Sequence, residues 1–288
     1  MRWMSHAVAW GAVLVGLGAH MGAAAQEAGD ALRMSDGASL STQADAAFHD
    51  IGTEGLTIEG WFYLDELPEV GEVQTFFSNP SKYALGMGIA KGDGDDEWYD
   101  PNEVRAFGSL SSEQGWGSRI KGTMGEGDHR NPPIKKWFHV AWQFHAEPPE
   151  VGWFYVHKQP IPLGRDERFP WALPAGDGAL SIATAKLGQH GFGVEPDTDI
   201  SVFRGLVDEV RVSSIARYDG RDAVRPRHFR PDRHTVALWT FDGDRPYADS
   251  SGAGHHLTHT GTITVEPLAV DGRGRLATTW AQIRSGGR

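Results

Sequence analysis

Carboxylates are the first residues whose spacing could do chemistry, because glycoside hydrolysis uses a pair of them about 5.5 Å apart in retaining enzymes. Residues i and i+2 of one strand, roughly 6.6 Å apart on one face, supply that spacing. The apolar stretches carry no such pair, because Glu59 is alone and Asp208 and Glu209 are adjacent, which predicts opposite faces. The spacing occurs in 195–199 (EPDTD), where proline indicates a loop. We therefore predict no catalytic residues.

Exposed aromatic side chains are the second candidates, because they stack on sugar rings. Trp98 and Tyr99 lie in the acidic segment 93–103, and Trp116 precedes the glycine-rich segment 122–127. We predict that these three aromatic residues line a ligand-binding rim, with burial in a core as the alternative. The acidic segment itself departs from the EF-hand pattern, since its sixth position is Trp98 instead of glycine, so a solvated loop is the preferred interpretation.

Metal and nucleotide motifs give weaker signals. His255, His256 and His259 could suggest zinc, but they lie in a predicted turn, and the chain has no cysteine and no obvious supporting acid there. The sequence contains no nucleophile elbow, phosphate-binding loop or dinucleotide fingerprint.

The elements that must position these residues are predominantly strands. Stretches rich in aromatic and β-branched residues run over 56–64, 137–144 and 202–212, between glycine, proline and aspartate turns. In 137–144, alternate residues predict one packed face and one outward face. One short helix is expected at 214–218. Further strands are expected at 73–78, 83–90, 104–110, 116–121, 150–157, 179–187, 235–241 and 261–265. This pattern predicts a β-sandwich or barrel.

The two ends of the chain differ from its middle. Residues 1–25 combine one charge, Arg2, with an apolar run and a small-residue end, which predicts a secretory signal peptide cleaved after Ala25, with a retained signal anchor as the alternative. No later segment approaches the ~20 apolar residues that span a bilayer. We therefore expect a secreted protein, extracellular, periplasmic or on the cell surface, with one domain at 28–268 and a flexible tail at 269–288.

Composition limits the partners. The chain has 27 basic and 38 acidic residues, a net charge of −11, which argues against nucleic acid as a ligand. The absence of cysteine excludes disulfides and thiolate metal sites. With 288 residues the chain is long enough to bury one large core without staples. Neutral glycans, cations and basic protein surfaces suit its charge.

Four stretches in order resemble the laminin-G-like jelly-roll domains of the concanavalin A-like lectin/glucanase superfamily, bacterial secreted type. They are 31–40, 56–64, 137–140 and 203–212, of which the last, FRGLVDEVRV, is the most specific. A fifth stretch, ALWTFD at 237–242 followed by DSSGAGHH at 249–256, resembles an element that comes first in many relatives. Because termini of such domains lie close together, we expect it to supply the same strand from the other end of the chain, with a truncated second copy as the alternative.

The resemblance implies an all-β fold, a two-sheet antiparallel β-sandwich of the concanavalin A-like jelly-roll kind. It also implies a structural calcium ion, in which Asp208 matches the closing-strand acid and Asp249 the acid of the turn, helped by the carbonyl of Gly252. The alternatives pair Asp208 with Arg211 or Arg33 and make Asp249 a turn former.

The function that these expectations favour is a secreted, non-catalytic binding module for carbohydrate or an extracellular protein. The alternatives are a glycoside hydrolase or lyase of the same superfamily, and a structural component of the cell surface or matrix, since one fold hosts all three.

Overall fold

The computed structural model describes residues 29–35, 37–48, 55–69, 72–79, 85–91, 104–111, 117–122, 133–144, 152–156, 159–163, 179–183, 203–218 and 226–268, all within one compact unit, Gly29–Leu268. The predicted signal peptide and tail lie outside these residues. Nowhere in the described ranges does a helix have the length and apolarity that a membrane crossing requires.

One sheet has eight strands, and all its neighbouring strands are antiparallel. Seven of them follow one another in space as β10 (Gln159–Leu163), β9 (Gly152–Val156), β8 (Trp137–Phe144), β3 (Leu56–Leu64), β12 (Gly205–Ser213), β1 (Asp30–Met34) and β15 (Ile263–Pro267). The eighth, β13 (Thr235–Trp239), also pairs with β12.

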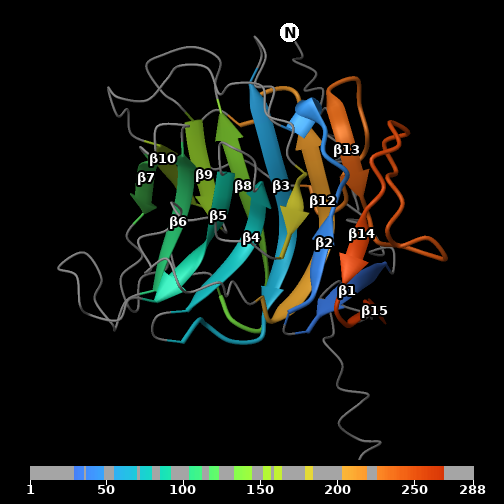
Figure 1. Cartoon of the computed structure of the whole chain (residues 1–288), viewed down its shortest axis with the longest axis horizontal. Coiled ribbons are helices and arrows are strands. Elements are labelled where there is room, and N and C mark those ends of the chain that lie inside the picture. The colour runs from blue at the N-terminus through green and yellow to red at the C-terminus, as the bar shows by residue number, and fades with distance from the viewer. Residues whose placement is uncertain are drawn as a thin grey trace, which may run out of the picture. The chain divides into compact units, whose positions relative to one another are not determined.

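The second sheet has seven strands and is also antiparallel throughout. Its spatial order is β14 (Thr258–Thr260), β2 (Ser39–Ser41), β11 (Ser181–Ile182), β4 (Val73–Asn79), β5 (Leu85–Lys91), β6 (Val104–Ser111) and β7 (Gly117–Gly122). A three-residue 3-10 helix, Ala46–Phe48, follows β2. Figure 1 shows the two sheets stacked face to face, so the prediction of a two-sheet antiparallel sandwich is confirmed.

Aromatic side chains join the two sheets. Phe62 of β3 packs against Phe76 and Phe77 of β4, with ring centroids 4.8 and 5.2 Å apart. Each of these side chains is fully buried, and burial of a phenylalanine contributes about 1.5–3 kcal/mol. The alternating apolar residues of the central strands therefore form the core from which the outward-facing residues project.

The outward face of the eight-stranded sheet is covered over its central strands, which the period-2 pattern does not predict. On β8, Phe138, Val140 and Trp142 lie in the core, yet His139, Ala141 and Gln143 are equally inaccessible. The covering segments are 214–218 and 226–229, since Tyr218 and Phe229 each pack a ring against His139. The outward side of these central strands is therefore a second buried layer, which contains polar side chains.

The helix predicted at 214–218 is wrong, because residues 214–215 form a bend and residues 216–218 have no regular secondary structure. Their backbone groups bond to side chains of the sheet instead. Gln143 accepts from Tyr218 N–H at 2.7 Å and donates to Tyr218 C=O at 2.6 Å, while Thr57 Oγ1 donates to Ile215 C=O at 2.7 Å. These bonds replace the i to i+4 bonds of a helix.

Strands β13 and β1 follow one another along the same edge of β12, with β1 paired to 205–207 and β13 to 210–213. At their junction, Asp30 N–H donates to Asp242 Oδ1 (2.8 Å) and Gly243 N–H to Asp30 Oδ2 (3.2 Å). The expectation that this element joins the main sandwich from the other end of the chain is confirmed. The alternative of a truncated second copy is wrong.

Candidate functional site

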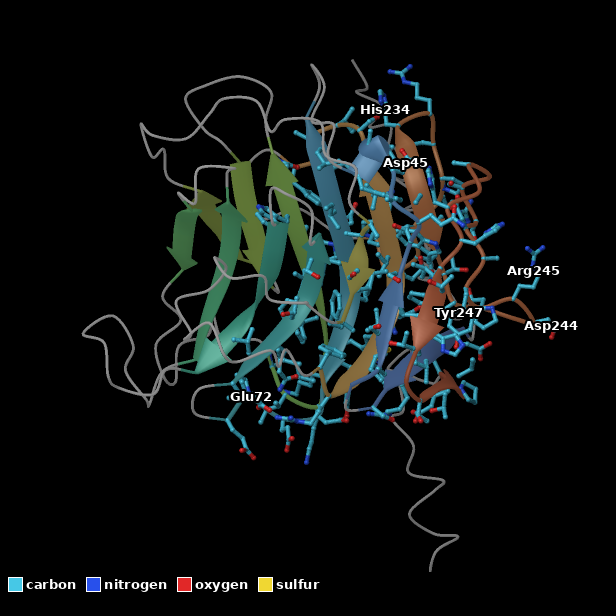
Figure 2. The ribbon with its side chains drawn as sticks, in the orientation of Figure 1. Asp45, Glu72, His234, Asp244, Arg245 and Tyr247 are labelled. Carbon is cyan, nitrogen blue, oxygen red and sulfur yellow. The ribbon has the colours of Figure 1, made fainter. Side chains whose placement is uncertain are left out.

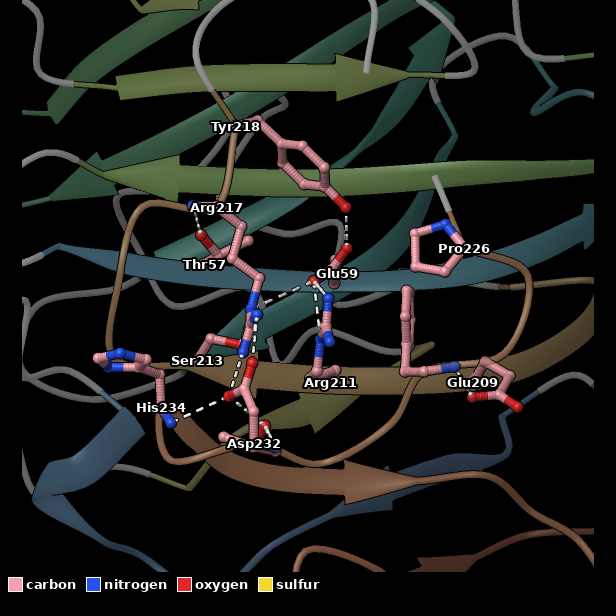
Figure 3. A network of polar contacts seen from close by, with 12 residues as sticks. Thr57, Glu59, Glu209, Arg211, Ser213, Arg217, Tyr218, Pro226, Asp232 and His234 are labelled. Carbon is pink, nitrogen blue, oxygen red and sulfur yellow. Dashed lines mark hydrogen bonds and ion pairs between the residues drawn. The ribbon is translucent and has the colours of Figure 1, made fainter. Parts of the chain in front are cut away.

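A buried polar cluster lies on the outward face of the central strands of the eight-stranded sheet (Figure 3). Glu59 Oε1 accepts from Arg211 Nε and Nη2 at 2.9 and 2.6 Å. Its Oε2 accepts from His139 Nε2 at 2.9 Å and from the Tyr218 hydroxyl. Arg211 in turn stacks on the ring of Phe229, 4.4 Å from its centroid.

The Glu59 carboxylate is saturated, and this decides its role. Burial alone would raise the pKa of Glu59, but the hydrogen bond and charge of His139, the charge of Arg211 and the Tyr218 hydroxyl outweigh burial and lower the pKa to about 2. An ionised carboxylate only accepts hydrogen bonds, and Glu59 is 0% exposed. The cluster therefore anchors the covering segments to the sheet and offers no group to a ligand.

Asp208, predicted to bind calcium, lies at a β-bulge of β12. The register shifts between Asp208 and Arg211, and Glu209 takes a left-handed backbone conformation (φ 51°). Both acids are buried, although their adjacency predicted opposite faces. Glu209 accepts from His228 Nδ1 and Phe229 N–H, both at 2.9 Å. The bulge thus turns Glu209 toward the covering segment.

The charges around Asp208 are mostly negative. Burial and repulsion by Glu209 and Asp242 raise the pKa of Asp208 well above its ordinary value, and Arg227 opposes them in part. The predicted alternative partners are engaged elsewhere: Arg211 binds Glu59, and Arg33 binds Asp65 at 2.6 Å and Glu266 at 2.9 Å. Pairing of Asp208 with either arginine is therefore wrong.

Asp249, the second predicted calcium ligand, caps its own turn. Its Oδ1 accepts from the N–H groups of Leu238 (3.0 Å) and Ser251 (2.8 Å). Its Oδ2 accepts from Ser251 Oγ (2.8 Å) and the N–H groups of Gly254 (2.9 Å) and His255 (3.1 Å). Five bonds saturate a carboxylate that has about four lone-pair sites, so Asp249 fits the turn-forming alternative and does not fit a calcium ligand. Gly252 lies in the same turn, at φ 89°.

Within the described ranges, no group of three or more histidine and acidic residues could hold a metal ion. The three histidines that suggested zinc have separate contacts: His255 packs edge-on against Phe48, His256 Nδ1 accepts from Asp249 N–H, and His259 stacks on Tyr247. The predicted rim residues Trp98, Tyr99 and Trp116, and the acidic segment 195–199, lie outside the described residues.

An exposed ladder of hydroxyl groups lies at the β14 edge of the seven-stranded sheet, and we call Ser39, Ser41, Thr258 and Thr260 the hydroxyl ladder. Register pairs Thr258 with Ser41 and Thr260 with Ser39. Their oxygens are 3.4 and 2.7 Å apart. Leu40, between the two serines, is fully buried, so the serines face away from the core, and both threonines are exposed.

The row containing Thr258 continues across the sheet. Ser41 is in register with Ser181 of β11, and Ser181 with Ser78 of β4. Ser181 and Ser78 are buried, so the row opens to solvent only toward β14. Figure 2 shows Tyr247 beside β14. Its ring stacks on that of His259, with ring centroids 4.8 Å apart, on the face of β14 opposite to Thr258 and Thr260, because side chains alternate along a strand. Hydroxyls both donate and accept hydrogen bonds, so the hydroxyl ladder suits ligands rich in hydroxyl groups.

The hydroxyl ladder is not predicted from the sequence. The alternations Ser39-Leu40-Ser41 and Thr258-His259-Thr260 are visible signals of outward polar faces, but they lie more than 200 residues apart. Their pairing follows from the register of β14 on β2, which no local pattern contains.

No family model and no curated protein sequence matches the chain. Several solved structures are similar. A Bacteroides ovatus protein described as carbohydrate-binding is 17% identical over 85% of this chain and 62% of its own (TM-score 0.49). The binding domain of botulinum neurotoxin DC, in complex with SialylT, is 11% identical over 67% and 44% (TM-score 0.37). Trypanosoma rangeli sialidase is 14% identical over 58% and 22% (TM-score 0.35). The chain thus spans less than two thirds of each of these structures, and similarity this distant does not identify a function.

Proposed function

We propose that the chain is a non-catalytic binding module that recognises neutral carbohydrate through the hydroxyl ladder. The observation that carries this proposal is the exposure of paired hydroxyls, on the outward side of a sheet whose inward side is core. Serine and threonine hydroxyls complement sugar hydroxyls because each group donates one hydrogen bond and accepts two. The net charge of −11 disfavours anionic glycans.

A glycan array with matched variants tests the proposal. Thr258→Val with Thr260→Val removes two hydroxyls while preserving shape and strand preference, and should weaken binding of neutral glycans roughly tenfold, since two hydrogen bonds contribute about 1–3 kcal/mol. Thr264→Val, an exposed threonine on β15, is the control and should bind as the parent does. Binding to no glycan, or unchanged binding by the double variant, would reject the proposal.

The same glycan array tests the predicted ligand-binding rim. Trp98→Ala and Trp116→Ala each remove a surface for stacking, which is worth most to a ligand that lies flat on the ring. If these variants lose binding while the threonine variant keeps it, the sugar site lies at the rim and the hydroxyl ladder is only a pair of cross-strand contacts.

We also propose that the chain is a laminin-G-like domain. The four stretches that carry the resemblance contain β1, β3, β8 and β12, which are neighbours in one sheet, and the first stretch also reaches into β2 of the other sheet. The adjacency of those four strands supports the assignment. We further propose export, with residues 1–25 as signal peptide. Amino-terminal sequencing of protein recovered outside the cytoplasm should then begin at Gln26, whereas an intact Met1 would contradict cleavage.

A further inference from the structure

Within the described part of the chain, strand β15 is the last strand of the eight-stranded sheet, and its hydrogen-bond register shows which of its backbone groups point away from β1. Beyond its ends, Leu268 N–H donates to Gly29 C=O (2.7 Å) and Ser35 N–H to Thr262 C=O (3.4 Å). In an antiparallel ladder, inward and outward pairs alternate. Thr264 and Glu266 therefore bond to β1, and the N–H and C=O groups of Ile263 and Val265 point away from the sheet.

Strand β15 lacks most of the features that prevent an edge strand from pairing with another chain. Natural edges are protected by lysine, by inward charges or by bulges, and β15 contains no lysine. Its single charge, Glu266, bonds to Arg33 at 2.9 Å, and Val265 is 42% exposed. Proline, which blunts an edge, occurs only at the last position, Pro267.

We propose that β15 pairs with β15 of a second copy of this chain, which would join two eight-stranded sheets into one. A two-fold axis at Thr264 places Ile263 opposite Val265 of the other copy, and the reverse. The outward N–H and C=O groups of both residues in both copies then form four hydrogen bonds. The missing N–H of Pro267 lies outside this set, whereas an axis at Val265 would place Ile263 C=O opposite the proline nitrogen.

A second copy fits this edge because the edge is complementary to itself. The two outward residues each supply one donor and one acceptor, symmetrically about Thr264, and both are apolar, so each cross-copy pair buries Val265 against Ile263. No like charges meet, since the only charged side chain is neutralised within its own copy. Long-range repulsion between two copies of net charge −11 opposes association, so the dimer should strengthen with added salt.

Sedimentation equilibrium of the full chain tests the dimer. Val265→Pro removes an outward N–H in each copy without touching the bonds to β1, and should weaken dimerisation roughly tenfold or more, as expected for two lost hydrogen bonds. Ile134→Lys, at a large apolar residue of similar exposure (46%) away from β15, is the control and should dimerise as the parent does. A monomeric parent, as would result if another segment of the chain covered β15, overturns the proposal, and so does a Val265→Pro dimer of unchanged strength.

Cross-linking tests the register independently, because the chain has no cysteine. Thr264→Cys places two thiols across the two-fold axis in a non-hydrogen-bonded pair, where Cα atoms are about 4.5 Å apart and a disulfide can form. Mild oxidation should therefore yield a covalent dimer. Thr260→Cys, at an exposed threonine on β14, should yield no covalent dimer. Cross-linking by Thr260→Cys and not by Thr264→Cys would overturn the proposed interface. Neither experiment depends on glycan binding.

Discussion

At the scale of single residues, the acids of this chain divide by their surroundings more than by their type. Glu59 and Asp208 both face outward from central strands and are both buried. Four donors from three side chains surround Glu59, whereas Asp208 lies next to two further acids and one arginine. At similar burial, the surrounding donors therefore keep the Glu59 carboxylate ionised, whereas burial and the neighbouring acids favour the protonated form of Asp208.

Substitution of Glu59 should be among the most damaging single changes. Glu59→Gln leaves Arg211 buried without its carboxylate, and removal of one partner of a buried pair costs about 3–5 kcal/mol. Urea denaturation measures this loss. Glu266→Gln, in the half-exposed pair with Arg33, is the control and should cost less than about 1 kcal/mol. Similar losses for the two variants would contradict the structural role of Glu59.

The stability supplied by the Glu59 charge should depend on pH with a definite sign. The pKa of Glu59 is lowered from an ordinary 4.5 to about 2 in the folded protein, so folding releases a proton. The contribution is complete above about 4.5 and is lost as the pH falls toward about 2. The difference in unfolding free energy between the parent and Glu59→Gln should shrink over that window. A constant difference would show that the lowered pKa is not the cause.

Asp208→Asn should have the opposite effect at neutral pH. Because burial and two neighbouring acids raise the pKa of Asp208, its charge opposes folding above the folded pKa, and its replacement should stabilise the protein. The gain should vanish at acidic pH, where Asp208 is protonated.

Thermal melting with calcium and with a chelator tests the predicted metal role of Asp208. Calcium should raise the melting temperature of the parent, and not of the Asp208→Asn variant, only if Asp208 is a ligand.

At the scale of elements, period-2 patterning predicts strands well and their partners poorly. The limits of β3 and β8 agree with the sequence, because long runs of aromatic and β-branched residues leave little ambiguity. Strands β10 and β14 are not predicted: they are short and rich in proline or threonine, and gain their pairing from neighbours. The bulge at Glu209 and the bend at 214–218 also arise from contacts distant in sequence, as does the hydroxyl ladder.

Gly205 tests the close approach of β12 to β3. A Cβ at this position would lie 1.9 Å from the carbonyl oxygen of Tyr63, a backbone atom that cannot move alone. Gly205→Ala should therefore cost about 3 kcal/mol or more. Gly252→Ala is the control, since it has open space and pays only for its left-handed backbone, about 1–2 kcal/mol. The two denaturation midpoints should rank in that order, and the reverse ranking would argue against tight pairing of the two strands.

At the scale of the whole molecule, segments from both ends of the described unit complete one core. Trp239 and Phe241 follow the most specific family-like stretch, yet both are buried with residues of β3 and β8. The first four family-like stretches thus cover only part of the folding unit, because the hydrophobic core closes only when β13, from the fifth stretch, extends the edge begun by β1.

Truncation tests whether the C-terminal strands belong to the folding unit. A fragment of residues 29–268 contains every strand of both sheets and should unfold in one cooperative transition. A fragment of residues 29–218 lacks β13 to β15 and exposes the apolar surface that Trp239, Phe241 and Leu257 cover. Removal of three such side chains costs about 3–5 kcal/mol each, comparable in sum with the whole stability of a domain. The shorter fragment should therefore lack a cooperative transition in urea. If it folds as sharply as the longer one, the C-terminal strands are an addition to the sandwich and not part of its core.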